Sequence, residues 1–272
     1  MARRNFFEII NNSPVNLKAE YNRIYTLFFK GTAYDEAVVD IVDEVFETLP
    51  THLRGRTISL SDFDSTYNFS FSENPLFFDC DDLISLCEYV WNLCKGVLRF
   101  AHHLISESNC QNIEHLLKVV DACIKDLQYM AVKQENVFIF VPQNATVVAV
   151  TEIVKEEIAL SVLEYHHYGL KGNLAKKKAI LKLLADEIEP KRKILNAHNL
   201  SGLGDLLFQM LQKFVRHNND KNEHISNMSA EETESCYDDI YQLWLLAELE
   251  IDNIERKQRV KKLLGDINSP TM

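Results

Sequence analysis

The segment 214–224 gathers the side chains that a metal-independent cleavage of a phosphodiester bond would need. Such a reaction uses a base for the ribose 2′-hydroxyl, an acid for the leaving 5′-oxygen, and a cation that stabilises the charge of the transition state. Arginine carries a permanent charge on a planar fork of donors, and histidine exchanges its proton near neutral pH. We therefore expect Arg216 to be the cation and His224 to transfer protons. Three further residues are expected to position the loop or the substrate: His217, Asn218 and Asp220.

The same segment also fits an ordinary helix end. Arginine and histidine complement the partial negative charge of a helix C-terminus, and a run of asparagine and aspartate is typical of a turn. Residue types leave both interpretations open. The position of Arg216 relative to His224 is what separates them.

A basic segment precedes this loop. Residues 171–193 include eight basic side chains and three acids, in a chain whose net charge is −11. Such a patch could face phosphate groups, although an ordinary solvated helix face is the alternative, and its role depends on lying beside Arg216. On the last helix, Asp238 or Asp239 is an expected partner for Arg216, because that helix directly follows the loop. The residues expected to contact RNA are Lys191, Arg192 and Lys193.

The other histidines and the six cysteines form no recognisable metal motif. Neighbouring residues of a helix point in different directions, so the pair His166 and His167 cannot bind one ion from regular geometry. No CxxC pair occurs, and the cysteines are expected to be small buried hydrophobes. Motifs for nucleotide hydrolysis, dinucleotide binding, α/β-hydrolase and zincin chemistry are missing. We therefore expect no cofactor and no metal.

The composition indicates an acidic globular protein. Its 272 residues, 46% of them hydrophobic, suffice for one large domain or two smaller ones. The net charge of −11 argues against a general nucleic-acid coat protein, although it allows a local basic cleft. Neither a signal peptide nor a run of 18 apolar residues is found, so a cytoplasmic protein without membrane association is expected.

Apolar residues recur at helical spacing along most of the chain, which predicts an all-α helical bundle with one small β-hairpin. The hairpin is expected to pair 129–133 with 137–141, and a boundary near residue 142 separates an N-terminal helical region, 1–142, from a C-terminal bundle, 143–272. The proline-containing segment 50–78 is expected to be a loop with one weak strand. The helices are expected at 15–29, 35–49, 79–105, 112–128 and 145–168, from 174 onward, at 206–215, and after residue 229.

Several residues indicate where helices begin and end. Ser229, followed three residues later by Glu232, is a capping box for the last helix. Pro190 is expected to kink or split the helix that begins after residue 173. Further N-caps are expected at Asp79, Asn144 and Asn173.

The C-terminal half resembles the HEPN superfamily, especially its bacterial abortive-infection branch. In that family an arginine at a helix end is followed by a polar residue, then by a histidine after four to six intervening residues, and then by a long last helix. Arg216, His217 and His224 take these places here, with seven intervening residues. The segments 170–175 and 189–193 and the hairpin before residue 142 are also similar to parts of abortive-infection proteins, and the resemblance covers roughly 112–265.

The resemblance implies a helical bundle that forms a homodimer, with two Arg/His loops meeting in a shared cleft that cleaves RNA without a metal. It also implies a toxin or effector of phage defence or of a toxin–antitoxin pair, held inactive by a protein partner. The alternative is a non-enzymatic interaction or adaptor subunit of a defence complex. In that case the Arg/His loop is a structural turn, and the aromatic-rich last helix or the segment 50–78 is a docking surface.

Overall fold

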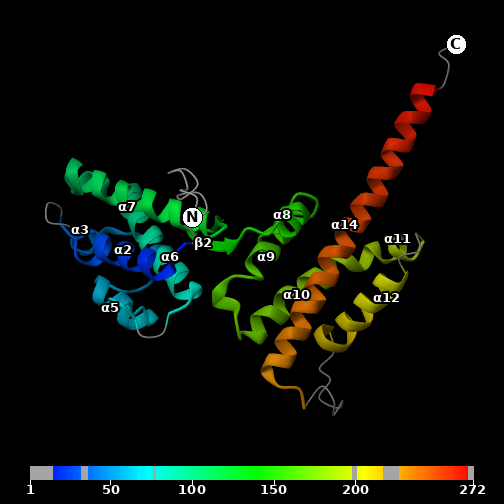
Figure 1. Ribbon diagram of the computed structural model, residues 1–272, viewed down its shortest axis with the longest axis horizontal. Helices are drawn as coiled ribbons and strands as arrows, with labels where there is room; N and C mark the ends of the chain where they lie inside the picture. Colours follow the sequence, from blue (N-terminus) through cyan, green and yellow to red (C-terminus); the bar gives the residue numbers. More distant parts are fainter. Residues whose placement is uncertain (1–14, 32–35, 76–77, 198–200, 217–226, 269–272) are drawn as a thin grey trace, which may run out of the picture. The chain divides into compact units, whose positions relative to one another are not determined.

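The computed structural model describes residues 15–31, 36–75, 78–197, 201–216 and 227–268 (Figure 1). Within these ranges the chain is mainly helical with a single two-stranded antiparallel hairpin, which confirms the predicted fold class. The chain divides into two compact units, Met1–Phe140 and Val141–Met272. No helix in the described ranges combines the length and the apolar character needed to span a bilayer.

The first unit is built around three helices, α2, α6 and α7, which pack against one another. Their contacting faces are lined by apolar residues at helical spacing, such as Ile24 and Phe28 of α2. Helix α3 covers α2 and α7. The elements of this unit are α2 (Leu17–Phe29), α3 (Val38–Val45), η1 (Phe46–Thr48), α4 (Thr51–Arg54), α5 (Leu60–Tyr67), α6 (Cys80–Gly96), η2 (Val97–Ala101), η3 (His102–Leu104), α7 (Glu107–Asp126), β1 (Tyr129–Gln134) and β2 (Val137–Pro142).

The segment 50–78 differs from the prediction, because it contains two short helices, α4 and α5, and no strand in its described residues. Ser59 caps α5 by accepting a hydrogen bond from the Asp62 backbone N–H at 3.1 Å. Leu60 is the buried residue of α5. Ser59 and Asp62, expected as loop formers, therefore act as a helix cap and a first-turn acid.

The predicted N-cap of α6 and the predicted β-hairpin are both present. Asp79 and Asp82 form a reciprocal capping box at the start of α6. The strands β1 and β2 turn through Glu135, whose φ of 53° is left-handed. Asn92 of α6 holds β2 in place, because its side chain accepts from the Phe138 N–H at 2.7 Å and donates to the Phe138 carbonyl at 2.8 Å.

The second unit is organised by the long helix α14 (Ala230–Asn268), which contacts α8, α10, α11 and α12. The predicted capping box is present, since the Glu232 N–H donates to Ser229 Oγ at 3.1 Å and the Ser229 N–H donates to Glu232 Oε2 at 2.7 Å. The other elements are α8 (Ala145–Thr151), α9 (Glu156–Glu164), η4 (Tyr168–Leu170), α10 (Leu174–Ile188), η5 (Glu189–Lys191), α11 (Arg192–Ala197), α12 (Ser201–Met210) and η6 (Leu211–Arg216).

Two predicted helices of this unit are divided. The helix expected at 145–168 is two helices, α8 and α9, with α9 starting after Lys155. Pro190 splits the next one as predicted: α10 ends at Ile188, and the proline lies at the start of the η5 turn. The chain then continues as α11, which packs against α12 and α14.

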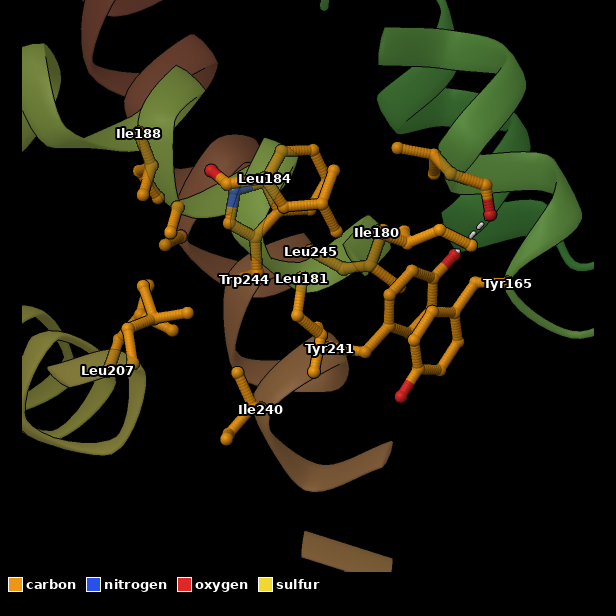
Figure 2. Close-up of a cluster of buried hydrophobic side chains, with 14 of the residues drawn as sticks. Tyr165, Ile180, Leu181, Leu184, Ile188, Leu207, Ile240, Tyr241, Trp244 and Leu245 are labelled. Atoms are coloured by element: carbon orange, nitrogen blue, oxygen red, sulfur yellow. Dashed lines mark hydrogen bonds between the residues drawn. The ribbon is translucent and has the colours of Figure 1, made fainter. Parts of the chain in front are cut away.

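The core of the second unit centres on Trp244 and Tyr241, which α14 inserts against α9 and α10 (Figure 2). Both side chains are fully buried, and each satisfies its polar atom with a backbone carbonyl. The Trp244 indole N–H donates to the Leu184 carbonyl at 2.9 Å, and the Tyr241 hydroxyl donates to the Val162 carbonyl at 2.7 Å. The rings of Tyr241 and Tyr165 stack in parallel, with centroids 4.1 Å apart.

We predict that Trp244→Ala lowers the free energy of unfolding by about 3–5 kcal/mol, because it leaves a cavity at the contact between α14 and α10. Chemical denaturation followed by circular dichroism measures this loss. Gln242→Ala, an exposed position on the same helix, is the control and should change the free energy of unfolding by less than about 0.5 kcal/mol. Equal stability of the two variants would contradict this description of the core.

Candidate functional site

Arg216 is the last residue of η6, a π-helical turn that continues α12. Buried Leu211 and Val215 hold this turn against the core of the second unit, and η6 packs on both α10 and α12. Single π-helical turns are rare and often lie at functional sites, since they change the direction in which the following side chains point. Arg216 is thus carried on a well-packed element, and its side chain is 31% exposed.

The guanidinium of Arg216 binds the C-terminal end of α10. Its Nη1 donates to Glu189 Oε2 at 2.7 Å, and its Nη2 donates to Asp186 Oδ1 at 3.0 Å and to the Ala185 carbonyl at 3.3 Å. The two carboxylate side chains are 78% (Asp186) and 41% (Glu189) exposed. These two carboxylates hold the fork of Arg216 at the surface, where a further anion can reach it.

A pocket of about 250 Å³ lies beside Arg216. Three cations line it, Arg192, Lys213 and Arg216, against one carboxylate, Glu189. The lining carries a formal charge of +2, and Asp186, which pairs with Arg216 from beside the pocket, reduces the local excess to +1 in a chain whose net charge is −11; this excess favours an anionic ligand. The remaining lining residues are Phe208, Gln209, Leu211 and Gln212.

Arg192 is positioned in this pocket by an aromatic ring. Its guanidinium carbon lies 4.7 Å from the centroid of the buried Phe208 ring, and Nη1 is 3.9 Å from Glu189 Oε1. Glu189 thus contacts both arginines, one through each oxygen. Since stacking on a ring leaves the edge of a guanidinium accessible, Arg192 keeps donors for an anion in the pocket.

The other two predicted RNA contacts lie elsewhere. Lys191 Nζ donates to Glu248 Oε1 at 2.9 Å and Oε2 at 2.8 Å, and lies 3.3 Å from Glu187 Oε1. Burial raises the pKa of Glu248 above its ordinary value, and Lys191 opposes that rise. This pair joins η5 to α14, so Lys191 has a structural task. Lys193 is exposed on α11 and is not part of the pocket lining.

Four of the predicted catalytic residues lie outside the residues that the structure describes: His217, Asn218, Asp220 and His224. The described part of the predicted site is therefore Arg216 together with Arg192. Sequence patterns alone did not indicate a role for Lys213, which lies three residues before Arg216, or for the pair Asp186 and Glu189. The spacing of these two acids by three residues near a helix end was the available signal, because such residues share one helix face.

The expected pairing of Arg216 with Asp238 or Asp239 is wrong, because the carboxylates that pair with Arg216 are Asp186 and Glu189. Asp238 Oδ1 lies 2.7 Å from Nζ of Lys177, which is also 2.8 Å from Glu234 Oε1. The Lys177 side chain is only 7% exposed, and its ammonium lies 5.1 Å from the Tyr165 ring centroid. A buried lysine needs such partners, so Glu234 and Asp238 of α14 pair with Lys177 of α10, and Arg216 pairs with Asp186 and Glu189.

The described ranges contain no group of three or more histidine, cysteine, aspartate or glutamate side chains that could hold a metal ion. His166 is half-buried, with its ring edge-on to Tyr241, and burial holds its pKa below the ordinary histidine value. Tyr165 and Tyr241 flank its ring, and the nearby charges of Asp238 and Lys177 act on its pKa in opposite directions.

No family model, curated protein or solved structure matches the chain.

The Lys177 network predicts acid-sensitive stability. The Lys177 ammonium and the Gly172 N–H hold the pKa of Glu234 below its ordinary value of 4.5. As pH falls, Glu234 is protonated in the unfolded chain before it is protonated in the folded protein. The stabilisation is therefore complete above the pKa that Glu234 has in the unfolded chain, and it is lost as pH falls through its lower pKa in the folded protein. Glu234→Gln should therefore flatten the fall in the free energy of unfolding below about pH 5.

The measurement is urea denaturation at a series of pH values between about 7 and 3. The exposed Glu231 of the same helix supplies the control, Glu231→Gln, which should retain the wild-type slope. Identical slopes for Glu234→Gln and the wild type would show that Lys177 does not stabilise the carboxylate.

Proposed function

We propose that this protein is a metal-independent endoribonuclease, resembling HEPN proteins, that acts in the cytoplasm as the toxin or effector of a phage-defence or toxin–antitoxin system. The observation that supports the proposal most directly is the cationic pocket formed by Arg192, Lys213 and Arg216. A phosphodiester is an anion of suitable size for it. The proposal also draws on the resemblance of the segment 216–224 to the family's Arg/His pattern.

Arg216 is suited to the role of the transition-state cation. Its guanidinium is planar and fixed by two carboxylates, so its orientation does not have to be established when a substrate arrives. Ion pairs this exposed contribute only about 0–1 kcal/mol each, and a doubly charged phosphorane can compete with the largely exposed Asp186 for Nη2. Charge-assisted bonds from guanidinium to phosphate are stronger than these surface pairs.

Arg192 and Lys213 would bind the phosphates that flank the scissile bond. His224 would remove the proton of the 2′-hydroxyl or protonate the leaving oxygen, and His217, Asn218 and Asp220 would position the loop or the RNA. In a homodimer two such loops would meet in one cleft, as the resemblance implies. A protein partner such as an antitoxin would hold the enzyme inactive.

We predict that Arg216→Ala and His224→Ala each reduce RNA cleavage by about 100-fold or more, since each removes a group that acts in the transition state. The assay incubates purified protein with total RNA in EDTA, and wild-type cleavage should persist there. Toxicity on expression in bacteria should fall in parallel. Arg192→Ala should weaken RNA binding more than it slows cleavage of bound RNA.

Arg23→Ala is the matched control, because Arg23 is also paired with a carboxylate, Glu20, but lies on α2 of the other unit. It should cleave RNA like the wild type. Full activity of both Arg216→Ala and His224→Ala, or loss of wild-type cleavage in EDTA, would refute the proposal.

The adaptor hypothesis is supported by a different observation. The last part of α14 exposes Val260, Leu263 and Leu264 by 50%, 59% and 53%. Apolar side chains grouped on one helix face commonly mark an interaction surface. A protein that cleaves no RNA but forms a defined complex through this helix would favour this second function.

A further inference from the structure

Helix α14 has one face that the rest of its unit covers and one that it does not. Trp244, Ile251 and Ile254 lie on the covered face and are buried. Beyond Ile254 the helix continues to Asn268, and its residues 255–265 are all exposed; the red end of α14 in Figure 1 extends past the other helices of its unit. A helical segment of about a dozen residues without neighbours is only marginally stable in water, so a stabilising neighbour is expected for the end of α14.

The uncovered face carries a heptad pattern. Leu246 lies on it within the unit and is 48% exposed, and the exposed Val260 and Leu263 follow on the same side further along. Alternating steps of three and four residues connect them, which is the spacing of a two-helix seam. The seam residues are the exposed Leu246, Arg256, Val260 and Leu263 and the half-buried Leu249 and Asn253, of which Leu249 also contacts the core of the unit.

Charges of opposite sign flank this seam in a fixed order. The acids Glu250 and Asp252 lie on its two sides near the middle of α14, and the bases Lys257 and Arg259 lie on the same two sides one heptad later. When two copies of such a helix run in opposite directions, the acids of one copy lie beside the bases of the other, so the surface is complementary to itself.

We propose that the uncovered face of α14 binds the same face of a second copy, in an antiparallel two-helix pair. A two-fold axis would pass near residues 254 and 255, so that seam residues whose numbers sum to 509 lie opposite each other, and flanking residues pair two positions to either side of that sum. Both ends of the seam then pair apolar side chains, and the polar residues meet in its centre. The three distinct layers are Leu246 with Leu263, Leu249 with Val260, and Asn253 with Arg256, each occurring twice by symmetry.

The flanking charges agree with this same register. On one side Glu250 faces Lys257 of the other copy, and on the other side Asp252 faces Arg259, again twice each. Within one chain Asp252 pairs with Arg256 at 2.7 Å and with Arg259 at 3.7 Å, and the two arginine side chains are largely exposed, so they can exchange partners at little cost in free energy. A parallel pair would instead place Arg256 against Arg256, which like-charge repulsion disfavours.

This surface does not depend on RNA cleavage. It is also separate from the shared-cleft interface of the proposed function, because an antiparallel pair centred on residues 254 and 255 places the two starts of α14 roughly 70 Å apart at ~1.5 Å of rise per residue. Sedimentation velocity between about 1 and 100 µM covers the range in which an interface below the standard size dissociates. The wild type should show a monomer–dimer equilibrium in that range. Glu250→Lys and Lys257→Glu should each weaken dimerisation at least about tenfold, because each places two like-charged pairs face to face.

Charge reversal provides two rescue tests. The double variant Glu250→Lys/Lys257→Glu should regain wild-type dimerisation. A mixture of the two single variants should form a heterodimer that neither forms alone, because lysines at 250 and 257 of one chain then face glutamates at 257 and 250 of the other.

Lys262→Glu is the matched control, since it makes the same change of charge on the opposite side of α14 and should leave dimerisation unchanged. Circular dichroism checks that all variants keep their helix content. A wild type that stays monomeric over the whole range would overturn the proposal. So would a dimer that is indifferent to both single reversals, or single variants that do not pair on mixing.

Discussion

The second unit depends on the contact of one face of α14 with α10. Trp244 and Tyr241 fill that contact, and each uses its polar atom to bind a helix carbonyl, so large aromatic side chains are buried without an unmet hydrogen bond at either. Two lysines reinforce the contact from its margins: Lys177 joins α10 to the start of α14, and Lys191 joins η5 to Glu248. The elements that carry Arg216 and Arg192 are thereby held at fixed positions on the same unit.

This arrangement divides the basic segment 171–193 into residues with different tasks. Lys177 and Lys191 neutralise acids of α14, whereas Arg192 stacks on Phe208 and lines a pocket. A run of positive charge in the sequence therefore does not correspond to one cationic surface. The three cations that do converge come from two elements, α11 and η6, and packing brings them together although the whole chain is acidic.

Local sequence patterns predicted much of the fold, but they could not predict which residues pair across long distances in the sequence. The caps at Asp79, Asn144 and Ser229 depend on residues two or three positions away, which a sequence displays directly. The helices within 50–78 were missed because serine and aspartate favour caps as well as loops. The partners of Arg216 lie 27 and 30 residues away, in η5 and at the end of α10, and only the tertiary structure reveals that α10 packs against η6. The position of His224 stays a prediction, as does the role of its neighbours.

The π-helical winding of η6 determines the direction in which the Arg216 side chain points. A turn closed by bonds to the fifth residue holds one more residue than an α-helical turn, and each α-helical residue rotates the chain by about 100°. Removal of a single residue between Leu211 and Arg216 would thus let the turn relax to ordinary winding and swing the guanidinium away from Asp186 and Glu189. Conversely, inserting one residue into a regular helix is a short evolutionary route that turns a solvent-facing arginine toward two carboxylates on a neighbouring element.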